Sequence, residues 1–516
     1  DLSVTSQLMT ALGPDLLLMG GAALLLLWAA WRPPSQAHQR AVGIGSMLLT
    51  VVVGAYVIWS LYQQRTATAG PIAEDNFRWM ADVVILLGTL FTVALTIDDN
   101  DRQHVEVAES HVLILFASSG MMLLAAAQDL MVVFLGIELM SLSVYSLVAI
   151  NRRSGRGAEG ALKYFLLGAF ATAFLLYGMA LVYGATGTTN LADIASRVIG
   201  LGLSRSPFLM IGIGLLLIGF GFKVAAVPFH MWAPDAYDGA PTPITAYMAA
   251  TYKAAAFAAL LRVWMEAFPG AYAEWRPAVA GLAIATMIVG NAVGLAQRNI
   301  KRMLAYSSIA HAGFLLVALA AGSTQSGSAM LFYLLAYTLA TFGAFSVVIV
   351  LSRSGDHPVL IEDFAGLWSI RPWLALGMGV MMLSLLGVSL FGCVGFFAKW
   401  YVLQAVLQAP VPQTTLAVIL VVTSVVSAGY YLYVIMLMFM RPRAEGAAIP
   451  EATGALTRAV MVICVLLILV LGVEPEWVVR VAARGTPILA APPQVVQGGT
   501  YGIPLPSAVQ DQVPVR

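Results

Sequence analysis

Charged residues are scarce in this chain. Lys, Arg, Asp and Glu make up 10% of its 516 residues, whereas 60% are hydrophobic. Soluble domains carry about 25% charged residues, so the composition excludes a chain of soluble domains. A net charge of +1 offers no basic surface, and we expect no nucleic-acid partner.

Cysteine and cofactor motifs are scarce as well. The two cysteines, Cys393 and Cys464, stand in separate apolar runs, and no Cys-x-x-Cys or Cys/His cluster occurs. We therefore expect no metal or iron–sulfur site in this chain. The sequence also lacks a phosphate-binding loop and a dinucleotide fingerprint. These absences predict a chain without a cofactor of its own.

Long apolar runs are abundant instead, and they predict an all-α, polytopic membrane protein with about 14 transmembrane helices. The expected spans are 14–31, 41–61, 79–97, 110–127, 130–150, 159–184, 207–229, 241–265, 276–296, 301–321, 327–352, 372–408, 414–440 and 456–474. They divide the chain into N-terminal helices (1–97), two five-helix units (108–265 and 276–440), a last helix (456–474) and a Pro-rich, extended tail (475–516).

The distribution of basic residues predicts the orientation. Loops after odd-numbered spans, counted with the adjoining span ends, hold fourteen Lys and Arg residues, and the loops opposite, counted in the same way, hold six, among them Arg78 and Arg262. Basic loops face the cytoplasm. Both termini are therefore expected on the outer side of the membrane.

A weak internal repeat links the two five-helix units. KYFLLGAFATAF (163–174) is similar to FYLLAYTLATFGAF (332–345), and GFGFK, which ends at Lys223, is similar to GFFAK, which ends at Lys399. Five spans separate the members of each pair. Because an odd number of spans reverses orientation, spans 4–8 and 9–13 are expected to be inverted repeats.

Apart from Lys301, the first residue of its span, four lysines fall inside predicted spans: Lys163, Lys223, Lys253 and Lys399. A charged lysine at the centre of a membrane helix costs about 2.5–3.5 kcal/mol, so such residues usually mark function. Lys163 starts its helix, and snorkelling to the interface is the alternative there.

Glu138 lies inside the fifth span, with Ser141 and Tyr145 on the same helical face. Close to a lysine its carboxylate would be ionised, and the two groups would share their protonation states. The alternative is an ion pair that only holds helices together.

Breaks are expected in the seventh and twelfth spans. Pro228 follows Lys223 by five residues and removes the helical partner of the Val224 carbonyl. Backbone freed at membrane depth must face protein or water. In the twelfth span the segment 387–399, just before Lys399, contains no proline, and Gly395, with Gly387 and Gly392, is the candidate for the break.

Histidine and tyrosine offer accessory proton carriers. His311 is a candidate relay between lysines, although a core histidine is an equal alternative. Tyr337 belongs to a polar stripe that could hold water or simply pack against other helices. His230, with Asp235 and Asp238, is expected in a cytoplasmic loop, where capping is the likelier use.

Three long segments carry a resemblance to a known family: 161–187, FKVAAVPFHMWAPDAYDGAPTPITAYMAA (222–250) and RNIKRMLAYSSIAHAGF (298–314). The chain resembles the antiporter-like membrane subunits of respiratory complex I, the proton-pumping NADH:quinone oxidoreductase. The resemblance implies that Glu138, Lys223, Lys253 and Lys399 transfer protons. It also implies a non-redox subunit, with NADH, FMN, Fe–S clusters and quinone bound elsewhere.

The resemblance further implies partners and leaves two alternatives open. The partners are other membrane subunits of complex I, including a sibling antiporter-like subunit, small membrane subunits and lipids. One alternative function is a cation/proton antiporter subunit of a multi-subunit antiporter. The other is a scaffold whose lysines only fix the packing of helices.

Overall fold

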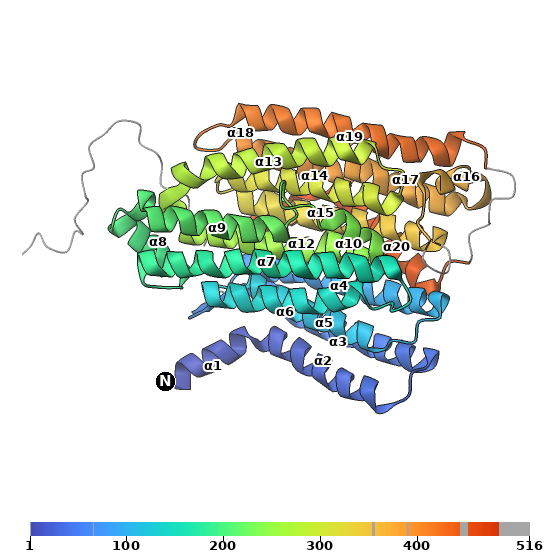
Figure 1. The fold of residues 1–516 in the computed structure, drawn as a ribbon, viewed down its shortest axis with the longest axis horizontal. Helices are drawn as coiled ribbons and strands as arrows, with labels where there is room; N and C mark the ends of the chain where they lie inside the picture. The colour runs from blue at the N-terminus through green and yellow to red at the C-terminus, as the bar shows by residue number, and fades with distance from the viewer. Residues whose placement is uncertain (1, 66, 353–356, 390–391, 444–451, 484–516) are drawn as a thin grey trace, which may run out of the picture.

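The computed structural model describes residues 2–65, 67–352, 357–389, 392–443 and 452–483. Regular structure in these ranges is helical except for one hairpin, β1 (Ala67–Ala69) and β2 (Ile72–Glu74). Figure 1 shows long helices side by side, with α2 and α3 at one edge of the molecule and α18 and α19 at the opposite edge.

The longer helices are α2 (Gly13–Trp31), α3 (Gln36–Tyr62), α4 (Asn76–Gln103), α5 (Glu109–Ala125), α6 (Leu130–Val148), α7 (Gly155–Thr186), α13 (Tyr272–Leu295), α14 (Ile300–Ala321), α15 (Ser326–Leu351), α19 (Thr414–Met440) and α20 (Ala455–Val473). The shorter ones are α1 (Leu2–Ala11), α8 (Leu191–Gly200), α9 (Pro207–Lys223), α10 (Ala233–Gly239), α11 (Thr242–Tyr247), α12 (Lys253–Ala267), α16 (Leu367–Ile370), α17 (Pro372–Leu386), α18 (Val394–Leu407) and α21 (Pro475–Ala483). A π-helical turn, η2 (Met248–Tyr252), joins α11 to α12.

These helices make the chain an all-α, multi-pass membrane protein, as predicted. Each expected span coincides with one helix or with a pair of helices. Within the described ranges, eleven helical segments are long and apolar enough to cross a membrane. The count of fourteen crossings and the inverted repeat stay predictions.

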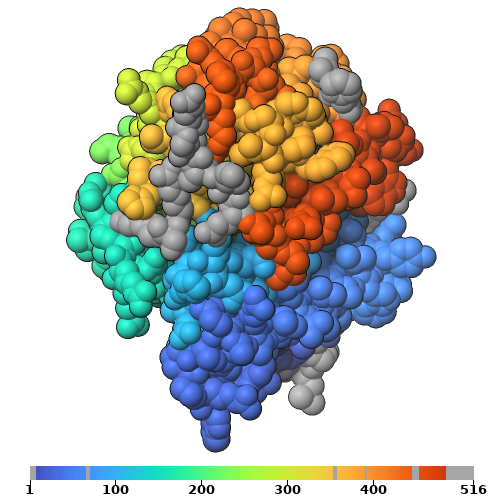
Figure 2. Space-filling view, turned by 90° about the vertical axis from the view of Figure 1, so that its right-hand side faces the viewer, coloured from blue at the N-terminus to red at the C-terminus, as the bar shows by residue number. Residues whose placement is uncertain are grey.

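Burial separates central from peripheral helices. The segment Thr242–Ala267 is 100% buried over its most apolar window and α14 is 94% buried, whereas α3, α7 and α19 are each 33% buried. The peripheral helices thus turn apolar side chains outward, as suits lipid or neighbouring membrane subunits. Figure 2 looks along the helices from one end and shows the N-terminal helices gathered on one side and the C-terminal helices on the other.

The seventh span is broken at the expected place. Helix α9 ends at Lys223 and α10 begins at Ala233, so Pro228 lies in the link between them. The backbone N–H of Val227 donates to Thr286 Oγ1 of α13 at 3.0 Å, and the Trp232 indole donates to the Phe222 carbonyl at 3.0 Å. Neighbouring side chains and the ring of Trp232 therefore satisfy backbone groups that the break frees.

The twelfth span is also broken, but not at Gly395. Helix α17 ends at Leu386, Gly387 follows with φ +79°, and α18 starts at Val394. Gly395 is the second residue of α18, and a Cβ there would lie 1.7 Å from the Ser384 carbonyl oxygen. The prediction for Gly395 was wrong: Gly387 supplies the left-handed backbone, and Gly395 allows α17 and α18 to touch.

We expect Gly395→Ala to lower the thermal stability of this chain, since the new methyl group must push two backbones apart. Overpacking of this kind costs about 1–3 kcal/mol. Gly214→Ala is the matched control, because no atom lies within 4 Å of a Cβ at Gly214 of α9. A thermal unfolding curve of the purified assembly would contradict this account if both variants melted at the same temperature.

Two further expectations need correction. Lys223 is the last residue of the half-helix before its break, whereas Lys399 lies in the half-helix after its break, so the GFGFK/GFFAK match does not place them equivalently. The tail is helical at its start: α21 buries Val478 and Ala482, one turn apart, and packs on α15. Pro475 fits the first helical position, which explains the helix. Residues 484–516 lie outside the described residues.

Candidate proton-transfer site

Lys223 occupies the C-terminal end of α9 and is buried. Its Nζ donates a hydrogen bond to Ser141 Oγ of α6 at 2.8 Å. Ser141 Oγ in turn lies 3.5 Å from the hydroxyl of Tyr252, in the π-helical turn. The partial negative charge at a helix C-terminus favours the protonated lysine.

Glu138 stands one turn before Ser141 on α6 and is half-buried. Its Oε1 accepts a hydrogen bond from Thr172 Oγ1 of α7 at 3.0 Å. Among the described residues Glu138 forms no ion pair with Lys223. The lysine instead donates its hydrogen bond to Ser141. The carboxylate and the lysine therefore lie along one face of α6 without direct contact.

Lys253 is the first residue of α12 and follows the π-helical turn directly. Its side chain is buried, and Nζ donates to the backbone carbonyl of Ser308 on α14 at 2.8 Å. A π-turn inside an α-helix is rare and often marks a functional position. It gives Lys253 a contact with the helix that carries His311.

Two tyrosines hold the imidazole of His311. Nδ1 lies 2.5 Å from the Tyr333 hydroxyl, and Nε2 lies 3.1 Å from the Tyr431 hydroxyl, which also contacts Ser307 Oγ. The Tyr337 ring lies 4.8 Å from the imidazole, centroid to centroid. Both ring nitrogens thus have hydroxyl partners that can donate or accept a proton.

Lys399, on α18, is the third buried lysine of the site. Its Nζ donates to the carbonyl of Leu386, the last residue of α17, at 2.8 Å and to Ser424 Oγ of α19 at 2.7 Å. The lysine therefore caps the C-terminus of the preceding half-helix, where the backbone leaves carbonyls unpaired.

A small cavity joins His311 to Lys399. Its volume is about 10 Å³, roughly the space that the centre of one water molecule needs. Tyr333, Tyr337 and Ser384 also line it. One water in this cavity would connect the imidazole to the ammonium group.

Together these groups form what we call the buried polar row: Glu138, Ser141, Lys223, Tyr252, Lys253, Ser308, His311, Tyr431 and Lys399. The sequence pointed to the charged members. It did not predict five uncharged partners, because only the packing of the helices shows which hydroxyl and carbonyl groups lie beside the charged side chains. These partners are Tyr252, Ser308, Tyr431, Ser424 and Thr172. The π-turn beside Tyr252 left no sequence signal.

Lys163 and His230 lie apart from the row. Lys163 is exposed on α7 and pairs with Glu159 at 2.7 Å and with Asp235 at 2.9 Å. His230 is half-buried in the link between α9 and α10. Asp235 and Asp238 belong to α10 rather than to a loop. The ion pairs of Lys163 favour the snorkelling alternative.

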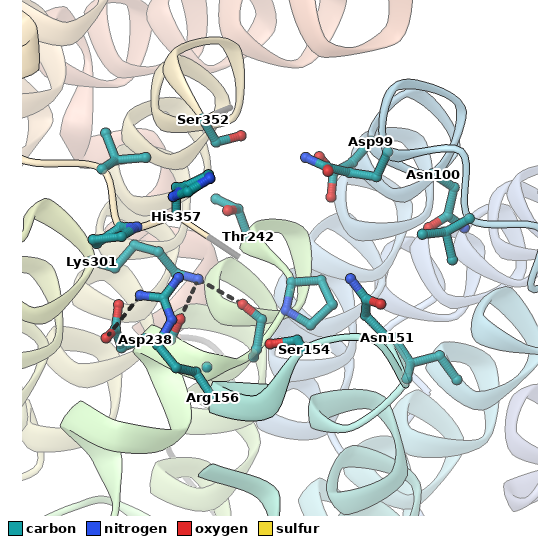
Figure 3. Close-up of a pocket in the computed structure, with 18 residues that line it drawn as sticks. Asp99, Asn100, Asn151, Ser154, Arg156, Asp238, Thr242, Lys301, Ser352 and His357 are labelled. Carbon is teal, nitrogen blue, oxygen red and sulfur yellow. Dashed lines mark hydrogen bonds and ion pairs between the residues drawn. The ribbon is translucent and has the colours of Figure 1, made fainter. Parts of the chain in front are cut away.

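A polar pocket of about 90 Å³ lies at one end of the helices. Figure 3 shows Arg156 and Lys301 beside Asp238, with Asp99 across the pocket. Arg156 pairs with Asp238 at 3.7 Å, and Lys301 donates to the carbonyls of Asp238 and Ala240. The lining includes Thr242, the first residue of the segment that leads to Lys253.

Comparison with known proteins defines the class. A family model described as "NADH:quinone oxidoreductase/Mrp antiporter, TM" matches residues 127–427. The fold is thus that of an antiporter-like membrane subunit. A curated relative from Gemmatimonas aurantiaca, NADH-quinone oxidoreductase subunit N, is 48% identical to this chain. The aligned region covers 94% of this chain and 95% of the relative.

Solved structures agree with this assignment. A chain of respiratory complex I from Thermus thermophilus, with bound aureothin, is 37% identical with a TM-score of 0.78 and covers 92% of this chain and all of that one. A chain of the Mrp complex from Dietzia shares the fold at 20% identity, with a TM-score of 0.81 and coverage of 94% and 98%. The chain belongs to the subunit N family of NADH-quinone oxidoreductases, whose mitochondrial counterpart is subunit 2.

Proposed function

We propose that this chain is the proton-translocating, non-redox subunit of a proton-pumping NADH:quinone oxidoreductase in a bacterial inner membrane, with both termini on the outer side. The observation that carries the proposal is the buried polar row, which sets three lysines and a histidine among hydroxyl groups inside the helices. NADH, FMN, Fe–S clusters and quinone would be bound by other subunits. A sibling antiporter-like subunit, small membrane subunits and lipids would cover the peripheral helices.

The row suggests how proton transfer responds to distant chemistry. A charge change in the neighbouring subunit shifts Glu138 relative to Lys223, and the lysine binds its proton more tightly when the carboxylate is near. On release, the proton moves through Ser141 and Tyr252 toward Lys253. From Lys253 the proton would pass by way of water to the hydroxyl groups of Ser307 and Tyr431 and then to His311, and the cavity leads to Lys399.

The pocket around Asp238 supports an entry route from the cytoplasmic side. Asp99, Lys301 and Thr242 line it, and their polar groups can hold water at the start of the segment that carries Lys253. We propose that protons enter there and reach Lys253 along that segment.

A cation/proton antiporter subunit is the second candidate, supported by the shared fold of the Mrp chain. Purified complex in sealed proteoliposomes separates the two. We expect NADH to drive proton uptake equally well in sodium-containing and sodium-free buffers. Exchange of sodium for protons without NADH would instead favour the antiporter.

A further inference from the structure

Two arginines lie buried at the end of the molecule that holds the start of α4. The orientation prediction places this end on the outer side of the membrane. The side chains of Arg78 and Arg262 are 0% and 1% exposed. The expectation that Arg78 lies in a loop was wrong, since it belongs to α4. Arg262 was counted with the outer loops although it falls within the expected span 241–265, and it belongs to α12. Both therefore need carboxylate partners inside the protein.

Each arginine is shared by two carboxyl groups. Arg78 pairs with Asp15 of α2 and, at 3.3 Å, with Asp82. Arg262 pairs with Asp75 and with Glu266, each at 2.8 Å. We call these six residues the carboxylate–arginine cluster. Asp75 joins its halves, because it pairs with Arg262 and accepts the backbone N–H of Arg78 at 2.7 Å.

The charges of the cluster do not balance. Four carboxyl groups face two guanidinium groups, and a guanidinium stays protonated in proteins. Full ionisation would leave two uncompensated negative charges away from water, which is strongly unfavourable. A site of this composition therefore favours a proton bound on its least compensated carboxyl group.

Asp82 is the least compensated member of the cluster. It is 0% exposed, its one contact with Arg78 is long at 3.3 Å, and its Oδ1 has no partner among the described residues. Asp15 Oδ1 is likewise buried without a partner. Arg78 meanwhile donates to the carbonyls of Ala11 and Ala73 at 2.9 Å. Asp75 contrasts with Asp82, since Arg262 holds both of its oxygens.

Other charged groups near this end leave the imbalance in place. Glu74 of β2 is buried and adds a further carboxyl group. Glu476 and Arg480, on the adjoining α21, are exposed to solvent. The backbone carbonyl of Arg65 accepts a hydrogen bond from the indole N–H of Trp79, the residue after Arg78, at 3.2 Å.

The cluster lies beyond the buried polar row on a shared helix. Arg262 follows Lys253 by nine residues on α12, roughly 14 Å along the axis. We propose that Asp82, with Asp15, holds one exchangeable proton and receives a proton that leaves the row at Lys253 toward the outer face. The transport part of this proposal rests on the proposed function; the bound proton does not.

Infrared spectroscopy of the whole purified complex tests the bound proton. At pH 7, we expect the spectrum of Asp82→Asn to lack one protonated-carboxyl C=O band, one that shifts on transfer to ²H₂O in the parent protein. Asp129→Asn is the matched control, since Met131 N–H and Thr189 Oγ1 already satisfy its carboxylate at the same end. An unchanged C=O region in Asp82→Asn overturns the proposal. A band that appears only on removal of sodium overturns it in favour of a cation site.

Proton pumping tests the transport part separately. We expect Asp82→Asn to assemble, to oxidise NADH when the membrane is made leaky, and to pump several-fold more slowly in sealed vesicles. Loss of the band together with normal pumping would reject the transport role of Asp82. It would not contradict proton transfer along the buried polar row. If Asp82→Asn does not assemble, both measurements are made on Asp15→Asn instead, since Asp15 lies on the peripheral α2.

Discussion

Lys223→Ala is expected to reduce proton transfer through this chain by roughly 100-fold. The variant removes the donor to Ser141 and leaves an apolar gap between Glu138 and the rest of the row. A charge in such a gap costs about 2.5–3.5 kcal/mol, and each 1.36 kcal/mol slows a step tenfold. The measurement is NADH-driven acidification of sealed vesicles, with the amount of assembled complex determined in the same membranes.

Lys223→Arg separates transport from scaffolding. Arginine keeps the positive charge and hydrogen-bond donors but does not release its proton in proteins. We expect this variant to assemble normally and still to pump poorly. Lys163→Arg is the control, because Lys163 is exposed and its ion pairs suit either cation. Normal pumping by assembled Lys223→Arg would support the scaffold alternative.

Lys399→Met is expected to block pumping to a similar degree and also to destabilise the twelfth span. Methionine fills a similar volume but leaves the Leu386 carbonyl and Ser424 without the ammonium donor. The Leu386 carbonyl then keeps only the long hydrogen bond from Ser424 Oγ, at 3.5 Å, and loss of a hydrogen bond from a charged donor costs about 1.5–3 kcal/mol. Pumping assays and thermal unfolding of the same preparation measure the two effects.

Ser424→Ala is the matched control for Lys399. It removes one partner of the lysine and keeps both the charge and the bond to the Leu386 carbonyl. We expect pumping to fall by no more than about tenfold, well short of the loss in Lys399→Met, since the lysine keeps its charge and its bond to the Leu386 carbonyl, and a hydrogen bond contributes about 0.5–1.5 kcal/mol. If Ser424→Ala were as inactive as Lys399→Met, the hydroxyl rather than the lysine would be the essential group.

The helices and the buried charges could be predicted from the sequence, for a physical reason. Apolar runs report membrane spans directly, and a lysine within one is too unfavourable to be accidental. Lys223, Lys253 and Lys399 are therefore visible before any packing is known. Pro228 is visible as well, because a proline removes a backbone donor wherever it stands.

The contacts that connect those charges could not be predicted. Lys253 binds a backbone carbonyl of Ser308, and any residue at that position would present the same group. Gly395 looked like a hinge, yet its role is to bring α18 against Ser384. Arg78 looked like a loop residue because its carboxylate partner Asp15 lies 63 positions away in sequence. Such distant pairings are set by tertiary packing alone.

The central claim is that protons cross this chain along the buried polar row, and Lys253→Met tests it most directly. Lys253 lies in the middle of the row, far from the expected contacts with other subunits. The measurement is the number of protons moved per NADH oxidised by purified complex in sealed proteoliposomes. Our account predicts a lower ratio for Lys253→Met, with unchanged NADH oxidation in leaky vesicles. An unchanged ratio in fully assembled complex would contradict it.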